Sequence, residues 1–486
     1  MKQLYVILLL LCSAGNALPQ DSLDLIDGIP LIITSWQAVD DYPDSLTLAL
    51  KELGANAVIA SDWQDRGRSL AESAGLLTIP YRVFPKENKA DTLIVRYTDA
   101  DYTVWEAEGN DLSEGEAKLT FDMDLGTMTD SFYTVSTPGN SVEVMWGPGY
   151  GQRINYQETN QNPIEHQVEL ICRARAKYGQ FPSDTTTIGY FYVRQNMLGN
   201  QNQYRNLVTR QVTVGEVKGD SWKSIYDDYF LTGSVYESLT VPEESEGFYS
   251  AGFIQFIFHW SGNDSILFDI DKVKTYDLRY GKDIAENNYV RSQVLEQAAS
   301  ILSGGGNPIG IYGMEEPKFI DNFAPYRMVD GLVRDVQSGV YLHTSFTPGQ
   351  FGRFGPWSLW GGAWSIFKAN EFYRRAKPHL LHLNLYHYDY PFSPANNDRP
   401  AVVAAKRQNL TWVITNLKEL RKVTDRFGYA IYGGMCYRRE GNGYVTHLRM
   451  PTTKEMLYSA NLGLLYGAKQ IWIDPYFSYN YPGTSI

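Results

Sequence analysis

Two adjacent carboxylates close a short apolar run in the middle of this chain of 486 residues. Glu315 and Glu316 follow residues 309–314 and precede Pro317. Cleavage of a glycosidic bond requires two carboxyl groups, one protonated as the acid and one ionised as the nucleophile or base. Because a neighbouring negative charge disfavours ionisation, Glu315 would raise the pKa of Glu316. The pair therefore indicates that Glu316 donates a proton; two glutamates that cap a following helix are the alternative.

The second carboxylate that this chemistry needs has three candidates. Asp474 ends the apolar run 470–474 before Pro475, Asp389 follows the run 380–388, and Glu440 lies in what reads as a glycine-rich loop. For Glu440 a solvated loop residue is the alternative. Glu315 would hold a substrate hydroxyl or tune Glu316. Because the second carboxylate is not identified, a protein that binds sugar without cleaving it remains an alternative.

Aromatic and polar side chains suited to sugar binding occur in the same half of the chain. The loop 348–364 interleaves glycine with rings such as Trp357 and Trp360, and flat rings stack on the apolar face of a pyranose. A loop that packs its own rings over the protein is the alternative. Along 380–388 polar residues alternate with leucine, which predicts a strand with one polar face. The candidates for substrate binding are Trp36, His343, Trp357, Trp360, His382, Asn384, Tyr386, His387, Tyr437 and Tyr476.

The histidines and cysteines lack the spacing of a known metal site. His343, His382 and His387 fit structural roles, and beyond Cys12 only Cys172 and Cys436 remain, far apart in the chain. We therefore predict neither a metal nor a cofactor. A barrel hydrolase that uses the histidines and a metal stays open as a further alternative.

The elements that must position these residues alternate between strand and helix. Three apolar runs of strand length precede residue 84, each separated by a helical pattern that ends in glycine, such as the one before Gly75. Five more follow the helical pattern 289–302, at 309–314, 340–346, 380–388, 429–435 and 470–474, with helices expected at 323–337, 364–376, 401–426 and 453–466. Eight parallel strands predict an α/β fold, a (βα)8 TIM barrel, whose loops at the carboxyl ends of the strands carry the chemistry.

The interruption between the third and fourth strands has a different composition. Residues 90–285 contain β-rich aromatic runs at 142–146, 165–172, 188–194 and 253–260, separated by turn residues. This pattern predicts an inserted all-β sandwich, jelly-roll-like, after the third strand. The expected organisation is a leader at 1–17, barrel strands in 18–89, the sandwich in 90–285 and the rest of the barrel in 286–486. The chain ends directly after the eighth strand, which favours a fragment without the last helix.

The strand end at 313–317 resembles the Asn-Glu-Pro or Asp-Glu-Pro strand end of retaining (βα)8-barrel glycoside hydrolases, the group that includes β-galactosidases and cellulases. The resemblance implies that Glu316 is the acid/base residue. Residues 449–469 resemble the seventh helix and eighth strand of β-galactosidase-like members, although Thr452 and Glu455 also have capping-box spacing. In that group a Glu nucleophile ends the seventh strand, and here that strand is followed by Cys436 and Tyr437.

The inserted segment has a second resemblance. Residues 102–108 and 258–274 are similar to edge strands of galactose-binding-like jelly rolls, a common carbohydrate-binding module. The second of these segments carries an acidic turn that includes Asp264, Asp269 and Asp271. Oxygen ligands gather at such a turn, so Ca²⁺ is conceivable there, but nothing fixes a set of ligands.

The N-terminus has the pattern of a secretory signal. Lys2 precedes the apolar residues 4–11, and Gly15, Asn16 and Ala17 form a plausible cleavage site. A buried helix that ends before Pro19 is the alternative, and Cys12 invites a lipoprotein interpretation that Leu11 weakens. We expect a secreted, periplasmic or extracellular protein without stable membrane insertion.

Composition limits the partners. The formal net charge is −12 and no basic stripe occurs, which argues against nucleic acid and favours neutral or cationic ligands. Together these features predict a secreted glycoside hydrolase-like enzyme that acts on an extracellular polysaccharide by carboxylate catalysis. A non-catalytic polysaccharide-binding protein on a degenerate glycosidase barrel is the alternative from another class.

Overall fold

The structure is a computed structural model, and its description covers part of the chain. The described residues are 25–26, 29–30, 32–35, 51–52, 55–61, 66–81, 93–98, 100–107, 117–118, 126–129, 131–135, 142–146, 164–197, 200–231, 253–313, 322–346, 372–384, 410–411, 413–415, 417–418, 420–432, 436–440, 443–448 and 453–474.

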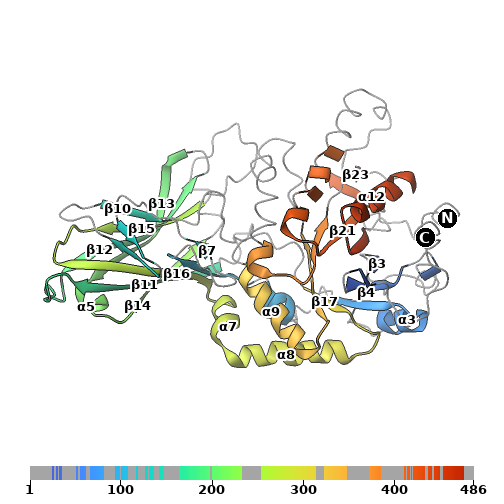
Figure 1. Ribbon diagram of the computed structural model, residues 1–486, viewed down its shortest axis with the longest axis horizontal. Coiled ribbons are helices and arrows are strands. Elements are labelled where there is room, and N and C mark those ends of the chain that lie inside the picture. The colour runs from blue at the N-terminus through green and yellow to red at the C-terminus, as the bar shows by residue number, and fades with distance from the viewer. Residues whose placement is uncertain are drawn as a thin grey trace, which may run out of the picture.

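Parallel strands occupy one end of the molecule (Figure 1). They pair in the order β19-β20-β21-β24-β3-β4-β5, and every pairing is parallel. A separate parallel pair, β17 and β18, continues from β5, because Thr78 of β5 forms a parallel bridge with Pro308, just before β17. The bounds are β3 Ile32–Ser35, β4 Ala57–Ser61, β5 Leu77–Tyr81, β17 Gly310–Tyr312, β18 Tyr341–His343, β19 Ser345–Phe346, β20 Leu381–Asn384, β21 Phe427–Tyr432 and β24 Gln470–Asp474.

Helices lie between these strands in the sequence and end where local chemistry favours an end. Gly75, with φ of +68°, follows α3 and supplies the left-handed conformation that glycine adopts most readily. The side-chain oxygen of Asn287 accepts the N–H groups of Tyr289 and Val290 at 3.1 and 3.4 Å and caps α8. The helices are α3 Arg66–Ala74, α4 Leu93–Thr98, α7 Gly281–Glu286, α8 Asn288–Ser303, α9 Phe323–Val336 and α12 Thr453–Leu465.

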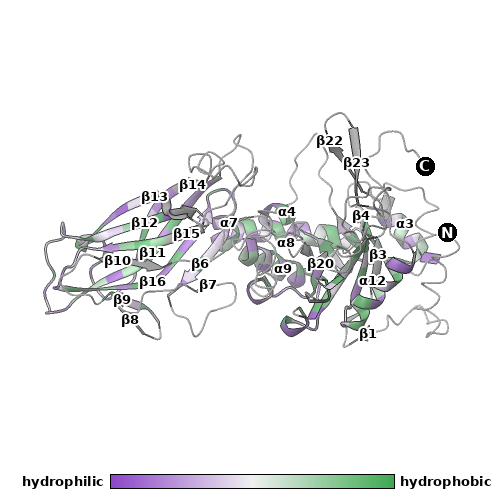
Figure 2. Ribbon diagram, turned by 90° about the horizontal axis from the view of Figure 1, so that it is seen from above, coloured by the Kyte–Doolittle hydropathy of each residue, from purple (hydrophilic) through white to green (hydrophobic). Residues whose placement is uncertain are grey.

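Two β-sheets, antiparallel apart from the short pair β6 and β7, fill the other end of the molecule (Figure 2). One has the order β10-β15-β12-β13, and the other has the order β14-β11-β16-β6-β7, with β9 on β16 and β8 on β9. The bounds are β6 Tyr102–Glu106, β7 Ala117–Lys118, β8 Gly126–Met128, β9 Tyr133–Val135, β10 Val142–Trp146, β11 Ile164–Ala176, β12 Thr187–Met197, β13 Asn200–Thr213, β14 Lys223–Leu231, β15 Phe253–Trp260 and β16 Ile266–Asp277, with the short helix α5 Val214–Val217 after β13.

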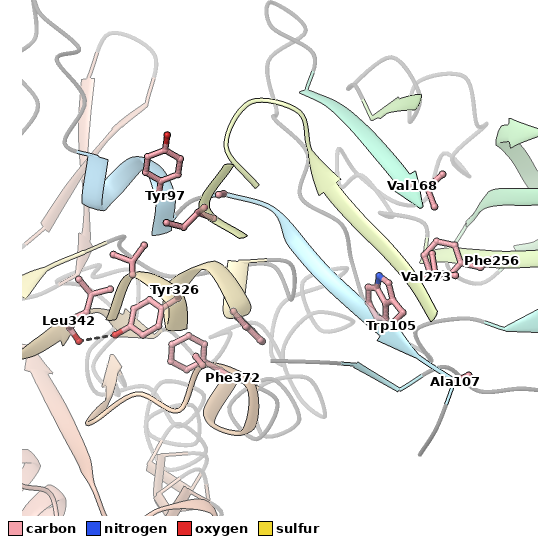
Figure 3. Packing of buried hydrophobic residues seen from close by; sticks show 14 of the residues in the cluster. Tyr97, Trp105, Ala107, Val168, Phe256, Val273, Tyr326, Leu342 and Phe372 are labelled. Carbon is pink, nitrogen blue, oxygen red and sulfur yellow. Dashed lines mark hydrogen bonds between the residues drawn. The ribbon is translucent and has the colours of Figure 1, made fainter. Parts of the chain in front are cut away.

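The inner faces of these two sheets pack on each other through aromatic rings. Phe258 of β15 stacks on Phe268 of β16 with ring centroids 4.3 Å apart, and Trp105 of β6 lies 6.0 Å from Phe256 of β15. Figure 3 shows Trp105, Phe256 and Val273 in this core. The segments that form β6 and β16 were expected at a sheet edge, but β16 pairs with β11 on one side and with β6 on the other.

A buried polar network joins the sheets to the helices. Asp101, directly before β6, accepts hydrogen bonds from His166 Nε2 of β11 and from Asn322 Nδ2 at the start of α9, each over 2.9 Å. Asp277 Oδ2, at the end of β16, accepts the backbone N–H of Asp101 over 2.7 Å. These four residues are at most 1% exposed. Buried hydrogen bonds therefore join the two-sheet layer to the helices of the parallel region.

Two short antiparallel pairs complete the described elements. β1 Leu25–Ile26 pairs with β2 Ile29–Pro30, and β22 Cys436–Glu440 pairs with β23 Gly443–Leu448. The glycine-rich loop expected around Glu440 is therefore a hairpin, and the prediction of a loop was wrong. Its signal is the Gly441–Asn442 dipeptide between two strand-like runs, a pair of residues that favours a hairpin. No helix of the described residues is long and apolar enough to span a bilayer.

Candidate functional site

The carboxyl ends of the parallel strands lie at one edge of the parallel region. Tyr432, which ends β21, pairs with Asp474, which ends β24, and Tyr312 of β17 pairs with His343 of β18. All these strands run in the same direction, so residues that follow them in the chain leave from the same edge. Asp474 thus ends its strand at the edge from which the chain leaves β17 toward Glu315 and Glu316.

The structure describes the five predicted catalytic residues to different extents. Glu315, Glu316 and Asp389 lie outside the described residues. Asp474 is the last residue of β24, and Glu440 is the last residue of β22, where it pairs with Gly443. Their backbones are described and their side chains are not. The catalytic roles of all five therefore stay predictions.

Near this edge, side chains of the parallel strands form a cluster of rings. His343 and His382 are 3% and 2% exposed. Both lie against Trp472 of β24, with centroids 5.8 and 4.1 Å from its ring, and Tyr341 stacks on His343 at 4.5 Å. Gln470 links two of these rings, since its Nε2 donates to the Tyr341 hydroxyl and its Oε1 accepts from Trp472 Nε1, both over 2.9 Å.

The two imidazoles are neutral because they are buried. Burial lowers the pKa of His343 to about 3, with a smaller contribution from the nearby His379. Burial also lowers the pKa of His382 well below its ordinary value, and His343 adds to the effect. Nε2 of His343 has no hydrogen-bond partner in the described part of the chain. The cluster is thus a packed, uncharged and partly polar interior.

Two glycines make room for these imidazoles. A Cβ atom on Gly310 of β17 would come within 2.2 Å of the His343 ring, and one on Gly428 of β21 would come within 2.5 Å of His382 Nδ1. Each histidine therefore fills the space of a missing side chain on the neighbouring strand. The alternation along 380–388 predicted a polar face that includes His382, and the rings that pack against His382 come from residues distant in sequence.

For the remaining predicted binding residues, the structure describes no side-chain positions. Asn384 lies in β20 and Tyr437 in β22, and of these two residues only the backbone is described. Outside the described residues are Trp36, Trp357, Trp360, Tyr386, His387 and Tyr476. Among the side chains that the structure describes, no group of three or more His, Cys, Asp or Glu could hold a metal ion.

The outer face of the four-stranded sheet carries an aromatic pair that the sequence analysis did not single out. Tyr190 and Tyr192 of β12 stack with centroids 6.4 Å apart and planes 20° apart. Tyr190 is 36% exposed, whereas Phe191 between them is buried in the core. The signal was available, because two tyrosines flank a phenylalanine in a strand-like run and must share the face opposite to it.

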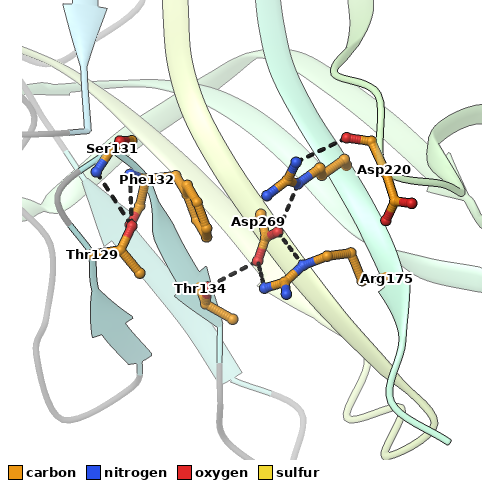
Figure 4. A network of polar contacts seen from close by, with 8 residues as sticks. Thr129, Ser131, Phe132, Thr134, Arg175, Asp220 and Asp269 are labelled. Atoms are coloured by element: carbon orange, nitrogen blue, oxygen red, sulfur yellow. Dashed lines mark hydrogen bonds and ion pairs between the residues drawn. The ribbon is translucent and has the colours of Figure 1, made fainter.

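Asp269, expected in an acidic turn, lies inside β16, and cationic side chains of the protein itself hold it. Asp269 is fully buried and accepts from Arg173 Nε at 2.9 Å, from Arg175 Nε and Nη2 at 2.6 and 2.8 Å, and from the Thr134 hydroxyl at 2.8 Å (Figure 4). The guanidinium of Arg173 lies over the rings of Trp222 and Phe132, at 4.3 and 4.9 Å. Asp269 therefore fastens β9 and β11 together.

Comparison with known proteins gives partial structural similarities. No protein-family model matches the chain, and no curated protein matches it. Among solved structures, the chain is similar to a family 29 carbohydrate-binding module from Piromyces equi, at 11% identity over 36% of this chain and 90% of that one, with a TM-score of 0.19. It is also similar to the GH26-CBM35 β-(1,4)-mannanase of Podospora anserina, at 13% identity over 79% of this chain and 78% of that one, with a TM-score of 0.22.

A further solved structure joins a binding module to an enzyme module. The chain is similar to the CBM22-1–GH10 modules of an endo-1,4-β-D-xylanase from Clostridium thermocellum, at 11% identity over 71% of this chain and 75% of that one, with a TM-score of 0.19. These neighbours are carbohydrate-binding modules and fusions of such modules with glycoside hydrolases. At these scores they carry no argument about this chain, and the proposals below rest on its residues.

Proposed function

We propose that this chain is a secreted, carbohydrate-active protein in which a (βα)8 barrel cleaves glycosidic bonds of an extracellular polysaccharide. The single observation that carries the proposal is the cyclic order of parallel neighbours. The order runs from β19 through β20, β21, β24, β3, β4 and β5, and the Thr78–Pro308 bridge extends it to β17 and then β18. β18 ends at His343 and β19 begins at Ser345, so both belong to one extended segment. Eight segments in such an order are what a closed barrel requires.

In this proposal Glu316 protonates the leaving oxygen and Asp474 supplies the second carboxylate. Glu316 follows β17 and Asp474 ends β24, and parallel strands deliver both to one rim. Asp474 is preferred over Glu440 because Glu440 belongs to the β22–β23 hairpin rather than to a strand of the parallel series. Asp389 follows β20 by five residues and is the other candidate.

A protein that binds polysaccharide without cleaving it is the second candidate function. It is favoured by β21, which ends at Tyr432 and is followed by Gly433, Gly434 and Met435, without a carboxylate. The resemblance to retaining glycosidases would require a Glu there.

The test is the release of reducing sugar from a panel of plant, algal and microbial polysaccharides, with Glu316→Gln, Asp474→Asn and Glu440→Gln. A positioned acid or base contributes about 10²- to 10⁴-fold to the rate. We expect losses of that order for Glu316→Gln and Asp474→Asn and nearly full activity for Glu440→Gln. Polysaccharide binding without turnover by the unchanged chain would favour the binding protein. Loss of turnover in chelator would favour a metal enzyme.

A further inference from the structure

A row of three side chains follows β12 on the outer face of the four-stranded sheet. Side chains alternate along a strand, so Tyr190, Tyr192 and Arg194 share one face while Phe191 and Val193 are buried on the other. The rings of Tyr190 and Tyr192 are stacked nearly parallel to each other, with 20° between their planes. Arg194 is held at its Nε, which donates to Asn206 of β13 over 3.1 Å. The row therefore offers two flat rings followed by a cation in one line.

The strands on either side flank this row mostly with polar groups. β12 lies between β15 and β13, so Tyr190 stands opposite His259 on one side and Gln211 on the other. Tyr192 stands opposite Thr209 of β13 on one side and the buried Ile257 of β15 on the other. Imidazole, amide and hydroxyl groups beside aromatic rings are suited to a ligand that has both apolar C–H faces and hydroxyl groups.

Strands β12, β13 and β15 together carry a net positive charge, whereas the whole chain is negative. β12, β13 and β15 contain three arginines and no Asp or Glu, although the chain carries 55 acidic residues and a net charge of −12. One arginine, Arg210, is paired with Glu216 at 2.7 Å. The two strands that flank Arg194 thus bring no carboxylate to this face, whereas Glu143 of β10, the strand beyond β15, pairs with His259.

We infer that this face binds a polysaccharide that carries uronic acid groups, with its sugar rings on Tyr190 and Tyr192 and a carboxylate at Arg194. A guanidinium is the side chain best matched to a carboxylate, because its N–H groups form a fork that meets two oxygens. The ligand chain would run along β12. The inference concerns binding alone and does not require the barrel to be an enzyme.

Affinity electrophoresis of the full chain tests this inference, with polygalacturonate, alginate and hyaluronan as acidic polymers and xylan, mixed-linkage β-glucan and galactomannan as neutral ones. We expect retardation by at least one acidic polymer, weakened by added salt because screening reduces charge pairing. Tyr190→Ala and Tyr192→Ala should each weaken that binding about two- to tenfold. Arg194→Gln should weaken it about tenfold and leave any binding of neutral polymers unchanged.

Tyr178→Ala is the matched control, because Tyr178 is 71% exposed in the turn after β11 and should leave binding unchanged. Three results would overturn the inference: no retardation by any acidic polymer, equal loss in the Tyr178 variant, or equal binding of acidic and neutral polymers that Arg194→Gln does not alter. A dimer in light scattering that Tyr190→Ala dissociates, without any polysaccharide binding, would assign the face to a second copy of the chain instead. Circular dichroism of each variant establishes that it is folded.

Discussion

Asn322 donates its Nδ2 to Asp101 Oδ1 over 2.9 Å across 221 residues of sequence. The same nitrogen donates to the carbonyl of Ala100 over 3.1 Å. Asn322 directly precedes α9, and Asp101 directly precedes β6, so one amide holds the helices of the parallel region to the two-sheet layer. Both residues are at most 1% exposed, and water cannot replace the partner that either one loses.

Replacing Asn322 with alanine should therefore destabilise the whole chain. The variant leaves the Asp101 carboxylate and the Ala100 carbonyl without this donor in a buried place, which costs about 2–3 kcal/mol of unfolding free energy. Urea unfolding followed by tryptophan fluorescence measures the change. Gln180→Ala, in an exposed turn, is the control and should change stability by less than about 0.5 kcal/mol. A loss below about 1 kcal/mol for Asn322→Ala would mean that the junction is not tightly coupled.

A comparison of Asp269 with Asp184 tests how burial changes the stabilisation that an ion pair provides. Arg175 Nε lies 2.6 Å from Asp269, which is fully buried, and Lys218 Nζ lies 2.6 Å from Asp184, whose side chain is 62% exposed. Asp269→Asn leaves two guanidinium groups without a counter-charge and should cost about 2–3 kcal/mol. Asp184→Asn should cost at most about 1 kcal/mol, because water screens that pair. Equal costs in urea unfolding would refute the structural role of Asp269.

Asp330 should make the chain more stable as the solution becomes moderately acidic. Its carboxylate in α9 accepts the N–H of Leu342 over 2.7 Å and lies 2.8 Å from Arg334, yet burial raises its pKa to about 6. An acid with a raised pKa in the folded state binds a proton more readily folded than unfolded, so its contribution to stability is present below about pH 4 and lost as pH rises through 6.

Asp330→Asn removes this titration and keeps an acceptor for Leu342. Between pH 7 and pH 4 the unchanged chain should gain about 3 kcal/mol relative to the variant, in keeping with a shift of about two pKa units. Urea unfolding of both proteins at each pH gives the difference. A difference that stays constant with pH would show that Asp330 is not the titrating group.

Local patterns were enough to predict many of the elements. The helix expected at 289–302 is α8, from Asn288 to Ser303, and the strands expected at 253–260 and 470–474 are β15 and β24 with the same bounds. These segments have strong periodicity or dense β-branched and aromatic residues, and their ends carry turn or capping residues. Such signals need no knowledge of distant contacts.

The features that failed prediction depend on partners far away in sequence or on the packing of a whole face. Nothing local to Asn322 or His166 shows that both meet at Asp101, 221 and 65 residues away. Likewise, β16 was expected at an edge because its own sequence does not reveal that β11 and β6 pair on both sides. The β22–β23 hairpin was different, since the Gly441–Asn442 dipeptide between its two strands was visible in the sequence and was interpreted as part of a loop.

His343 should make the chain less stable in acid, in the opposite direction to Asp330. Its pKa falls to about 3 in the folded state, whereas an unfolded histidine titrates near 6.5. Below pH 6.5 the unfolded chain therefore gains a proton that the folded chain does not bind, and stability falls as pH falls toward 3. Tyr341 and Trp472 pack against its ring, and His379 and His382 lie nearby. None of these four groups is a carboxylate that could offset the positive charge of a protonated His343.

His343→Phe tests this claim, because phenylalanine keeps an aromatic ring against Tyr341 and Trp472 and cannot take up a proton. Each pH unit below 6.5 should cost the unchanged chain about 1.4 kcal/mol at this site. Between pH 7 and pH 5 the variant should therefore lose about 2 kcal/mol less than the unchanged chain in urea unfolding. Between pH 7 and pH 8 the two profiles should run parallel, which serves as the internal control. Parallel profiles down to pH 5 as well would mean that the imidazole is protonated in the folded protein and that the ring cluster admits charge.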